Sequence, residues 1–110
     1  MKIFTLCGSY RFKSEMTKLA EELTLEGNCV LTPIDLTRSG QDAYTAEEIS
    51  TLKAMHKEKI RLSDAIFVVN VDGYIGDSTR SEIEYARALG KKLLFYSDKL
   101  KLLIEEEHKL

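Results

Sequence analysis

Two short polar segments of this chain carry residue types that bind a ligand. One is Gly8-Ser9-Tyr10-Arg11, which combines a glycine, a hydroxyl and a cation; the other begins at Asn70 and continues through Gly76-Asp77-Ser78-Thr79. Hydroxyls and backbone N–H groups at the start of a helix form a site for an anion. Both segments are therefore candidate ligand sites, and a sugar or a sugar phosphate is the class of ligand that they suit. For Ser9 and Arg11 an ordinary turn with a solvated charge is the alternative interpretation.

Glu82 is the candidate for chemistry beside these segments, and it has two interpretations. It lies about one turn after Thr79, so its carboxylate can project toward the same ligand, where the helix dipole favours negative charge. The spacing Thr79-x-x-Glu82 also fits a capping box, in which Glu82 only accepts a hydrogen bond from a free backbone N–H. The spacing alone leaves both interpretations open.

The histidines and cysteines form no pattern of their own. His56 falls in the helix expected before the central strand, where a lone histidine more often packs at the edge of the core than acts in catalysis. Cys7 and Cys29 lie in or at the end of apolar runs, so we expect two buried free thiols, as in a reducing compartment. Because neither histidine has cysteines or carboxylates at ligand spacing, we expect no metal site and no cofactor.

Short β-rich runs alternate with helical patterns along the chain. The expected strands are 3–7, 29–32, 64–71 and 92–96, and the expected helices are 14–26, 45–62, 79–89 and 99–108. Residues 34–44 form a long loop, a kind of segment that often binds ligands.

The second of these helices has the clearest start signal. Thr45 and Glu48 have the spacing of a capping box. Apolar positions along this helix recur at helical spacing and are expected to face the core: Ile49, Leu52, Met55 or His56, Ile60 and Leu62.

This alternation with short connections predicts a parallel sheet with helices on both faces. The predicted fold is a single-domain flavodoxin- or Rossmann-like three-layer α/β sandwich with a four- to five-stranded parallel sheet, over residues 1–110. In such sheets ligands bind beyond the carboxyl ends of the strands. Each polar segment follows a strand, so both are expected at that edge.

The composition excludes several classes of protein. The formal charge is -2 with both signs interleaved, so the chain lacks the basic surface of a protein that binds polymeric nucleic acid. No run approaches the roughly 18 to 20 apolar residues of a membrane span. The N-terminus enters a strand directly, without the apolar segment of a secretory signal, so we expect a cytoplasmic protein. A domain this small has a modest core, which association would help to stabilise.

Three motifs resemble one known family. The segment 4–11, Phe-Thr-Leu-Cys-Gly-Ser-Tyr-Arg, resembles the opening strand and Cys-Gly-Ser-x-Arg loop of the 2′-deoxynucleoside 5′-phosphate N-hydrolases, in the nucleoside 2-deoxyribosyltransferase superfamily. The segment 63–70 is similar to the superfamily's Ala-Asp-x-Val-Val-Ala strand. The segment 77–86 is similar to its Asp-x-Gly-Thr-x-x-Glu-x-Gly-x-Ala helix start, and 88–92 matches the turn into its last strand.

The resemblance implies a reaction and a ligand. Glu82 takes the place of the family's nucleophile, which attacks the anomeric carbon of the sugar, displaces the base and leaves a glycosyl ester for water or a second base to resolve. The loop 8–11 and Ser78-Thr79 would hold the sugar and any 5′-phosphate. The small-molecule partner is then a nucleoside or nucleotide, and a homodimer or higher homo-oligomer is expected because family members often complete their pockets from a neighbouring subunit.

Three positions depart from the family pattern. Ser78 and Glu84 stand where the family has glycine, and His56 stands where the N-hydrolases carry an aspartate that partners the nucleophile. Histidine still offers a general acid or base. The departures leave open a second function, a non-catalytic nucleotide-binding or sensing module of the same fold. A phosphoribohydrolase is a weaker alternative, because the chain lacks the Pro-Gly-Gly run of those enzymes.

Overall fold

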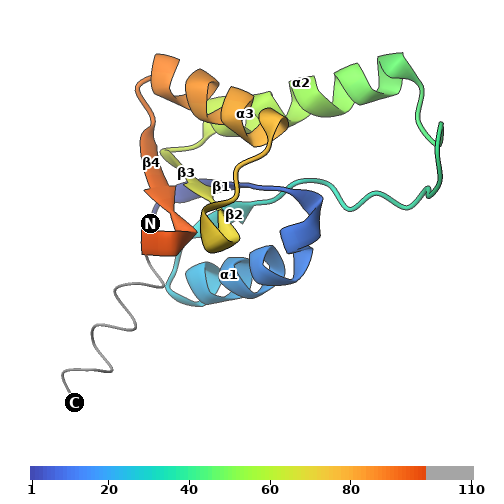
Figure 1. The fold of residues 1–110 in the computed structure, drawn as a ribbon. Helices are drawn as coiled ribbons and strands as arrows, with labels where there is room; N and C mark the ends of the chain where they lie inside the picture. The colour runs from blue at the N-terminus through green and yellow to red at the C-terminus, as the bar shows by residue number, and fades with distance from the viewer. Residues whose placement is uncertain (99–110) are drawn as a thin grey trace.

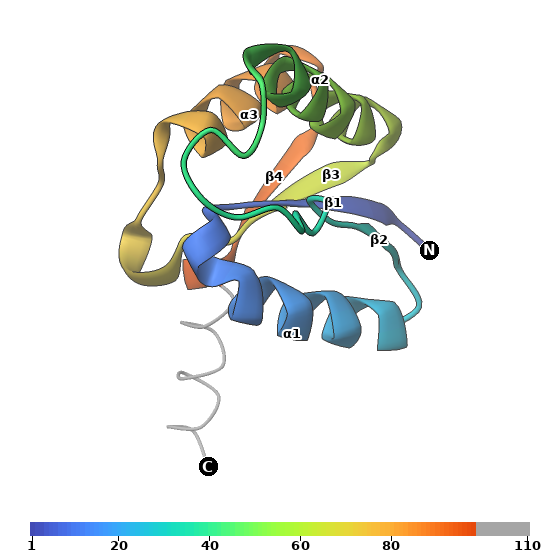
Figure 2. The ribbon, with the colours of Figure 1, turned by 90° about the vertical axis from the view of Figure 1, so that its right-hand side faces the viewer.

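The computed structural model describes residues 1–98, and its centre is a four-stranded parallel sheet (Figures 1 and 2). The strands are β1 (Ile3–Cys7), β2 (Cys29–Leu31), β3 (Ala65–Val68) and β4 (Lys92–Phe95). Their order in the sheet is β2-β1-β3-β4, and every neighbouring pair is parallel. The change of direction between the β1–β2 and β1–β3 crossovers is the topological switch point beside which such sheets bind ligands.

Helices cover both faces of the sheet, as Figure 2 shows. α1 (Lys13–Leu25) packs on one face, and α2 (Ala46–Leu62) and α3 (Asp77–Ala88) pack on the other. Two short 3₁₀ helices, η1 (Tyr10–Phe12) and η2 (Val71–Gly73), follow β1 and β3. The three-layer flavodoxin- or Rossmann-like α/β fold predicted from the sequence is therefore confirmed, with four strands.

The two faces of each central strand supply two cores, because successive side chains of a strand point to opposite sides. The core under α1 contains Phe4, Leu6, Phe12, Met16, Leu19, Leu23, Ala65, Phe67 and Val69. The core under α2 and α3 contains Cys7, Ile60, Ile66, Val68, Ile83 and Ala86. β3 is buried along its whole length, which explains its continuous apolar run.

α2 confirms one prediction and corrects another. The capping box forms: the Thr45 hydroxyl accepts from the Glu48 backbone N–H and the Glu48 carboxylate accepts from the Thr45 N–H. The predicted apolar face is wrong in part, because Ile49, Met55 and Leu62 are exposed while Ile60 is fully buried. In Figure 1 the N-terminal half of α2 extends past the sheet, so no strand lies beneath it.

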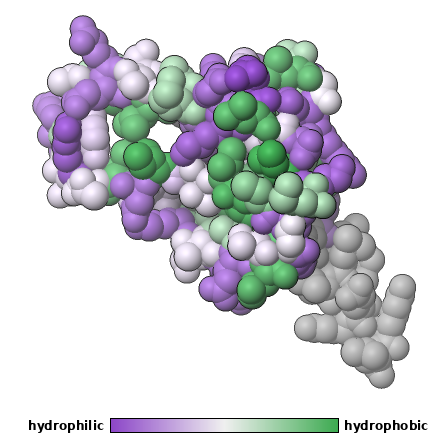
Figure 3. Space-filling view, turned by 180° about the vertical axis from the view of Figure 1, so that it is seen from behind, coloured by the Kyte–Doolittle hydropathy of each residue, from purple (hydrophilic) through white to green (hydrophobic). Residues whose placement is uncertain are grey.

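Two further expectations concern the ends of the sheet and of the chain. Cys7 is buried as expected, but Cys29 is exposed, since it begins the edge strand β2 and has β1 on one side only. The helix predicted at 99–108 lies outside the described residues. The loop between β2 and α2 arches away from the body of the protein (Figure 1). Hydrophobic residues gather on part of the rear face (Figure 3). None of the helices within residues 1–98 combines the length and apolar character that crossing a membrane requires.

Candidate active site

The carboxyl ends of β1 and β3 lie side by side, because Cys7 pairs with Val68 in the parallel register. The chain leaves both strands here, and Gly8 passes close to Val69. A Cβ on Gly8 would lie 3.1 Å from the Val69 carbonyl oxygen and 3.2 Å from its Cβ. A side chain at this position would therefore crowd Val69, and glycine allows the two strand ends to approach closely where the first polar segment begins.

Glu82 points to this edge from α3, and it does not cap the helix. The N-cap of α3 is Gly76, and no side chain makes a capping hydrogen bond there. The capping-box interpretation of Thr79 and Glu82 is therefore wrong, because the helix begins earlier than the sequence indicates and Glu82 lies well inside it. The Glu82 side chain is 15% exposed and lies on the sheet side of α3.

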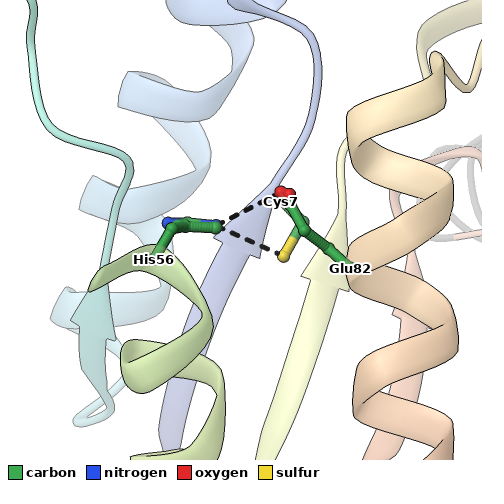
Figure 4. Close-up of side chains that lie close together, drawn as sticks. All are labelled: Cys7, His56 and Glu82. Atoms are coloured by element: carbon green, nitrogen blue, oxygen red, sulfur yellow. Dashed lines mark hydrogen bonds and ion pairs between the residues drawn. The ribbon is translucent and has the colours of Figure 1, made fainter. Parts of the chain in front are cut away.

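His56 reaches the same point from α2. The helix is fixed to β1 one turn later, where the Thr5 hydroxyl donates to the Lys59 carbonyl at 3.0 Å and also hydrogen-bonds the Ser63 hydroxyl. His56 Nε2 lies 3.5 Å from Glu82 Oε1 and 3.6 Å from Cys7 Sγ (Figure 4). Three elements far apart in sequence thus bring one imidazole, one carboxyl and one thiol together.

Burial controls the protonation of this cluster. It raises the pKa of Glu82 to about 7, with the nearby Lys57 acting in the opposite direction. Burial, with a contribution from the charge of Lys59, lowers the pKa of His56 to about 4. Burial and the charge of Glu82 raise the pKa of the Cys7 thiol. At neutral pH His56 is therefore neutral, Cys7 is a thiol, and Glu82 is divided between its two forms.

The second carboxylate oxygen of Glu82 has no partner within residues 1–98. Among the described residues, Glu82 Oε2 is buried and has no hydrogen-bond partner. A buried polar atom without a partner is costly, and in native proteins such an atom commonly serves a ligand or a reaction.

The first polar segment contacts the second through Arg11 and Tyr74. Ser9 caps η1 by accepting from the Arg11 backbone N–H, and the Arg11 guanidinium stacks 4.1 Å from the Tyr74 ring centroid. Tyr10 turns elsewhere, because its hydroxyl donates to Asp35 at 3.1 Å in the long loop. Gly8, Ser9 and Arg11 therefore lie beside the second segment, and Tyr10 contacts the loop.

The residues of the second segment have different surroundings. Asp77 and Ser78 are exposed in the first turn of α3, and Thr79 is buried. Asn70 is nearly buried, and both ends of its amide hydrogen-bond Ser97, which follows β4. Its amide therefore joins β3 to β4, an arrangement that the sequence could not indicate.

Cys7 is the cluster residue that the sequence analysis missed. An apolar run surrounds it, so the sequence predicts a buried thiol at this position and assigns it no part in the chemistry. The available signal was its position as the last residue of β1, directly before Gly8, where parallel strands present side chains to a site.

The chain is similar in fold to a solved structure, whereas its sequence matches no family model. No model of a protein family matches the chain, and no curated protein is similar to it at a significant level. Among solved structures, the chain resembles the 2-deoxyribosyltransferase of the psychrotolerant bacterium Bacillus psychrosaccharolyticus, with a TM-score of 0.67 and 19% sequence identity. The match covers 84% of this chain and 70% of that enzyme. The two proteins share an α/β fold.

Proposed function

We propose that this chain cleaves or exchanges the N-glycosidic bond of a nucleoside or nucleoside 5′-monophosphate, as a member of the nucleoside 2-deoxyribosyltransferase superfamily. The observation that carries the proposal is Glu82, a mostly buried carboxylate that caps nothing, lies at the carboxyl edge of the sheet and has one unpartnered oxygen. Among superfamily members, the chain is most similar in its motifs to the 2′-deoxynucleoside 5′-phosphate N-hydrolases.

In the proposed reaction, ionised Glu82 attacks the anomeric carbon. A C–O bond forms as the C–N bond breaks, and the base leaves with the bonding electrons and takes up a proton from water. Water or a second base then attacks the anomeric carbon and loses a proton to solvent, and the ester C–O bond breaks to restore the carboxylate. A partly desolvated carboxylate is a stronger nucleophile than one in water. His56, whose Nε2 lies 3.5 Å from Glu82 Oε1, is the proposed catalytic partner of this carboxylate.

The polar segments supply the binding groups for the sugar and phosphate. The N-terminus of α3 presents free backbone N–H groups together with Ser78 and Thr79. The loop that contains Gly8, Ser9 and Arg11 lies beside this segment, because Arg11 stacks on Tyr74, the residue after η2. Gly76, Asp77 and Asn70 complete the proposed binding set. Glu84, which replaces a family glycine, is exposed on α3, so it does not place a charge against the phosphate.

The proposal extends to the domain organisation, the location and the assembly of the protein. Residues 1–110 form one deoxyribosyltransferase-like domain acting on a small molecule in the cytoplasm. Exposed apolar side chains on α2, among them Met55 and Leu62, support a homodimer or larger assembly that covers them. Polymeric nucleic acid is not a partner.

The test is chromatographic detection of free base. Ribo- and deoxyribonucleosides and their 5′-monophosphates are incubated with the protein, with and without an acceptor base. Release that requires water alone identifies a hydrolase, and exchange that requires the acceptor identifies a transferase. Glu82→Gln should abolish release, while Glu84→Gln, a matched change on the exposed side of α3, should retain it.

A non-catalytic nucleotide-binding module is the second candidate, because His56 replaces the partner carboxylate of the N-hydrolases. It predicts a nucleotide-dependent rise in melting temperature with no base released from any substrate. That result would contradict the catalytic proposal.

A further inference from the structure

Cys7, His56 and Glu82 together form a set of metal-ligand types. One ligand atom from each of the three residues lies within 4.8 Å of the other two. Thiolate, imidazole and carboxylate are the three side-chain ligands that Zn²⁺ uses in proteins, and three protein ligands with an open fourth position are typical of reactive zinc sites.

Two of the three separations among these atoms match those of a zinc site, and the third, from Cys7 Sγ to the Glu82 carboxylate, lies within 4.8 Å. With zinc–ligand bonds of about 2.3 Å to sulfur and about 2.0–2.2 Å to nitrogen and oxygen, a tetrahedral site separates S from N by about 3.6 Å and N from O by about 3.4 Å. The observed separations are 3.6 Å from Cys7 Sγ to His56 Nε2 and 3.5 Å from His56 Nε2 to Glu82 Oε1. Two edges of a zinc tetrahedron are therefore already formed.

We propose that Cys7, His56 and Glu82 bind one Zn²⁺ ion through Sγ, Nε2 and a carboxylate oxygen, leaving the fourth position to water, and that this ion blocks Glu82 as a nucleophile. The binding half of the proposal is independent of any activity, and the inhibitory half rests on the proposed function. Sequence spacing gave no sign of the site, because 49 residues separate Cys7 from His56.

Charge and protons balance when zinc binds. The thiolate and the carboxylate together carry two negative charges, which one Zn²⁺ neutralises, so the buried cluster with its metal has no net charge. Binding must displace the proton of the Cys7 thiol and any proton on Glu82, whereas neutral His56 needs no change. Zinc affinity is therefore expected to rise with pH.

The binding test uses reduced, metal-free full chain and a chromophoric zinc chelator as competitor. One zinc ion per chain is expected, and Cys7→Ser should weaken binding at least about a hundredfold. Cys29→Ser is the matched control and should leave zinc affinity unchanged. Cys29 pairs with Ile3 at the amino end of β1, whereas Cys7 lies at the carboxyl end of that strand. Equal zinc affinity in the wild type and Cys7→Ser would overturn the proposal.

Cobalt gives a second measurement that does not depend on a variant folding. Co²⁺ added to the wild type should give a thiolate-to-cobalt charge-transfer band and the intense visible bands of a four-coordinate ion. The weak spectrum of octahedral cobalt bound only to oxygen would contradict the assignment.

The proposal that zinc blocks Glu82 is tested by comparing the rate of base release with zinc present to the rate without it. Zinc should suppress release in the wild type and in Cys29→Ser, and its effect should be lost in Cys7→Ser. Stoichiometric zinc binding with no base release from any substrate would refute the proposed function and leave the zinc site standing. Base release that zinc does not affect, in a protein that binds no zinc, would refute the zinc site alone.

Discussion

Burial shifts the pKa values of Glu82 and His56 in opposite directions, so the two residues should make opposite contributions to the pH dependence of stability. Substituting one residue at a time should separate these two contributions. The pKa of Glu82 is raised from 4.5 to about 7 in the folded protein, so its contribution to stability is full below pH 4.5 and is lost as pH rises through 7. The pKa of His56 is lowered from 6.5 to about 4, so its contribution is full above pH 6.5 and is lost as pH falls through 4. Both shifts come mainly from burial.

Between pH 4.5 and 6.5 the two effects oppose each other. There the folded state binds one proton more on Glu82 and one fewer on His56 than the unfolded chain. Each group alone changes the free energy of unfolding by about 1.4 kcal/mol per pH unit, with opposite signs. The wild type should therefore be nearly flat across the interval. Stability should rise with pH in Glu82→Gln and fall in His56→Gln, each by about 2–3 kcal/mol.

The assay is urea unfolding of metal-free protein, with a chelator present, at several pH values across this interval. Glu84→Gln is the control and should follow the wild type, because Glu84 is exposed on the same helix. Parallel profiles for Glu82→Gln and His56→Gln would refute the reasoning, since they would mean that neither group has the buried environment assigned to it.

Three further predictions concern other parts of the structure. Thr45→Ala removes the hydroxyl half of the capping box of α2 and should lower the free energy of unfolding by about 1 kcal/mol; an unchanged urea midpoint would contradict this. Gly8→Ala places a methyl 3.1 Å from the Val69 carbonyl oxygen and should lower the free energy of unfolding by about 1–3 kcal/mol in the same assay. Wild-type stability of this variant would contradict the expected steric conflict. Arg11→Met removes the cation stacked on Tyr74 and should raise KM for 5′-monophosphates about tenfold with little change for nucleosides, as measured by base release; equal effects on both substrates would exclude a phosphate contact.

The sequence predicted the fold well because the signals that determine it are local. The apolar runs around β1 and β3 and the capping box at Thr45 each mark one element. Alternation of strands and helices then restricts the topology to a parallel sheet. The apolar pattern of α2 misled at Ile49 and Met55, because periodicity cannot show that part of a helix extends past the sheet.

The geometry of the candidate site depends on contacts between distant elements, which the sequence does not show. The motif singled out Glu82 as a candidate, but whether it capped α3 depended on where that helix begins. The pairing of His56 with Cys7 joins residues 49 positions apart and becomes visible only when α2 is placed over β1. Asn70 shows the same limit, since its amide is held by Ser97 across the sheet.

Glu82 is the residue proposed to carry out the glycosidic chemistry. The most direct measurement is the initial rate of base release by Glu82→Gln relative to Glu84→Gln, on whichever nucleoside or 5′-monophosphate the wild type turns over fastest, with both variants shown to be folded. Glu84→Gln should keep a rate close to that of the wild type, and the rate of Glu82→Gln should fall at least about a thousandfold. Comparable rates in the two variants would contradict this role for Glu82.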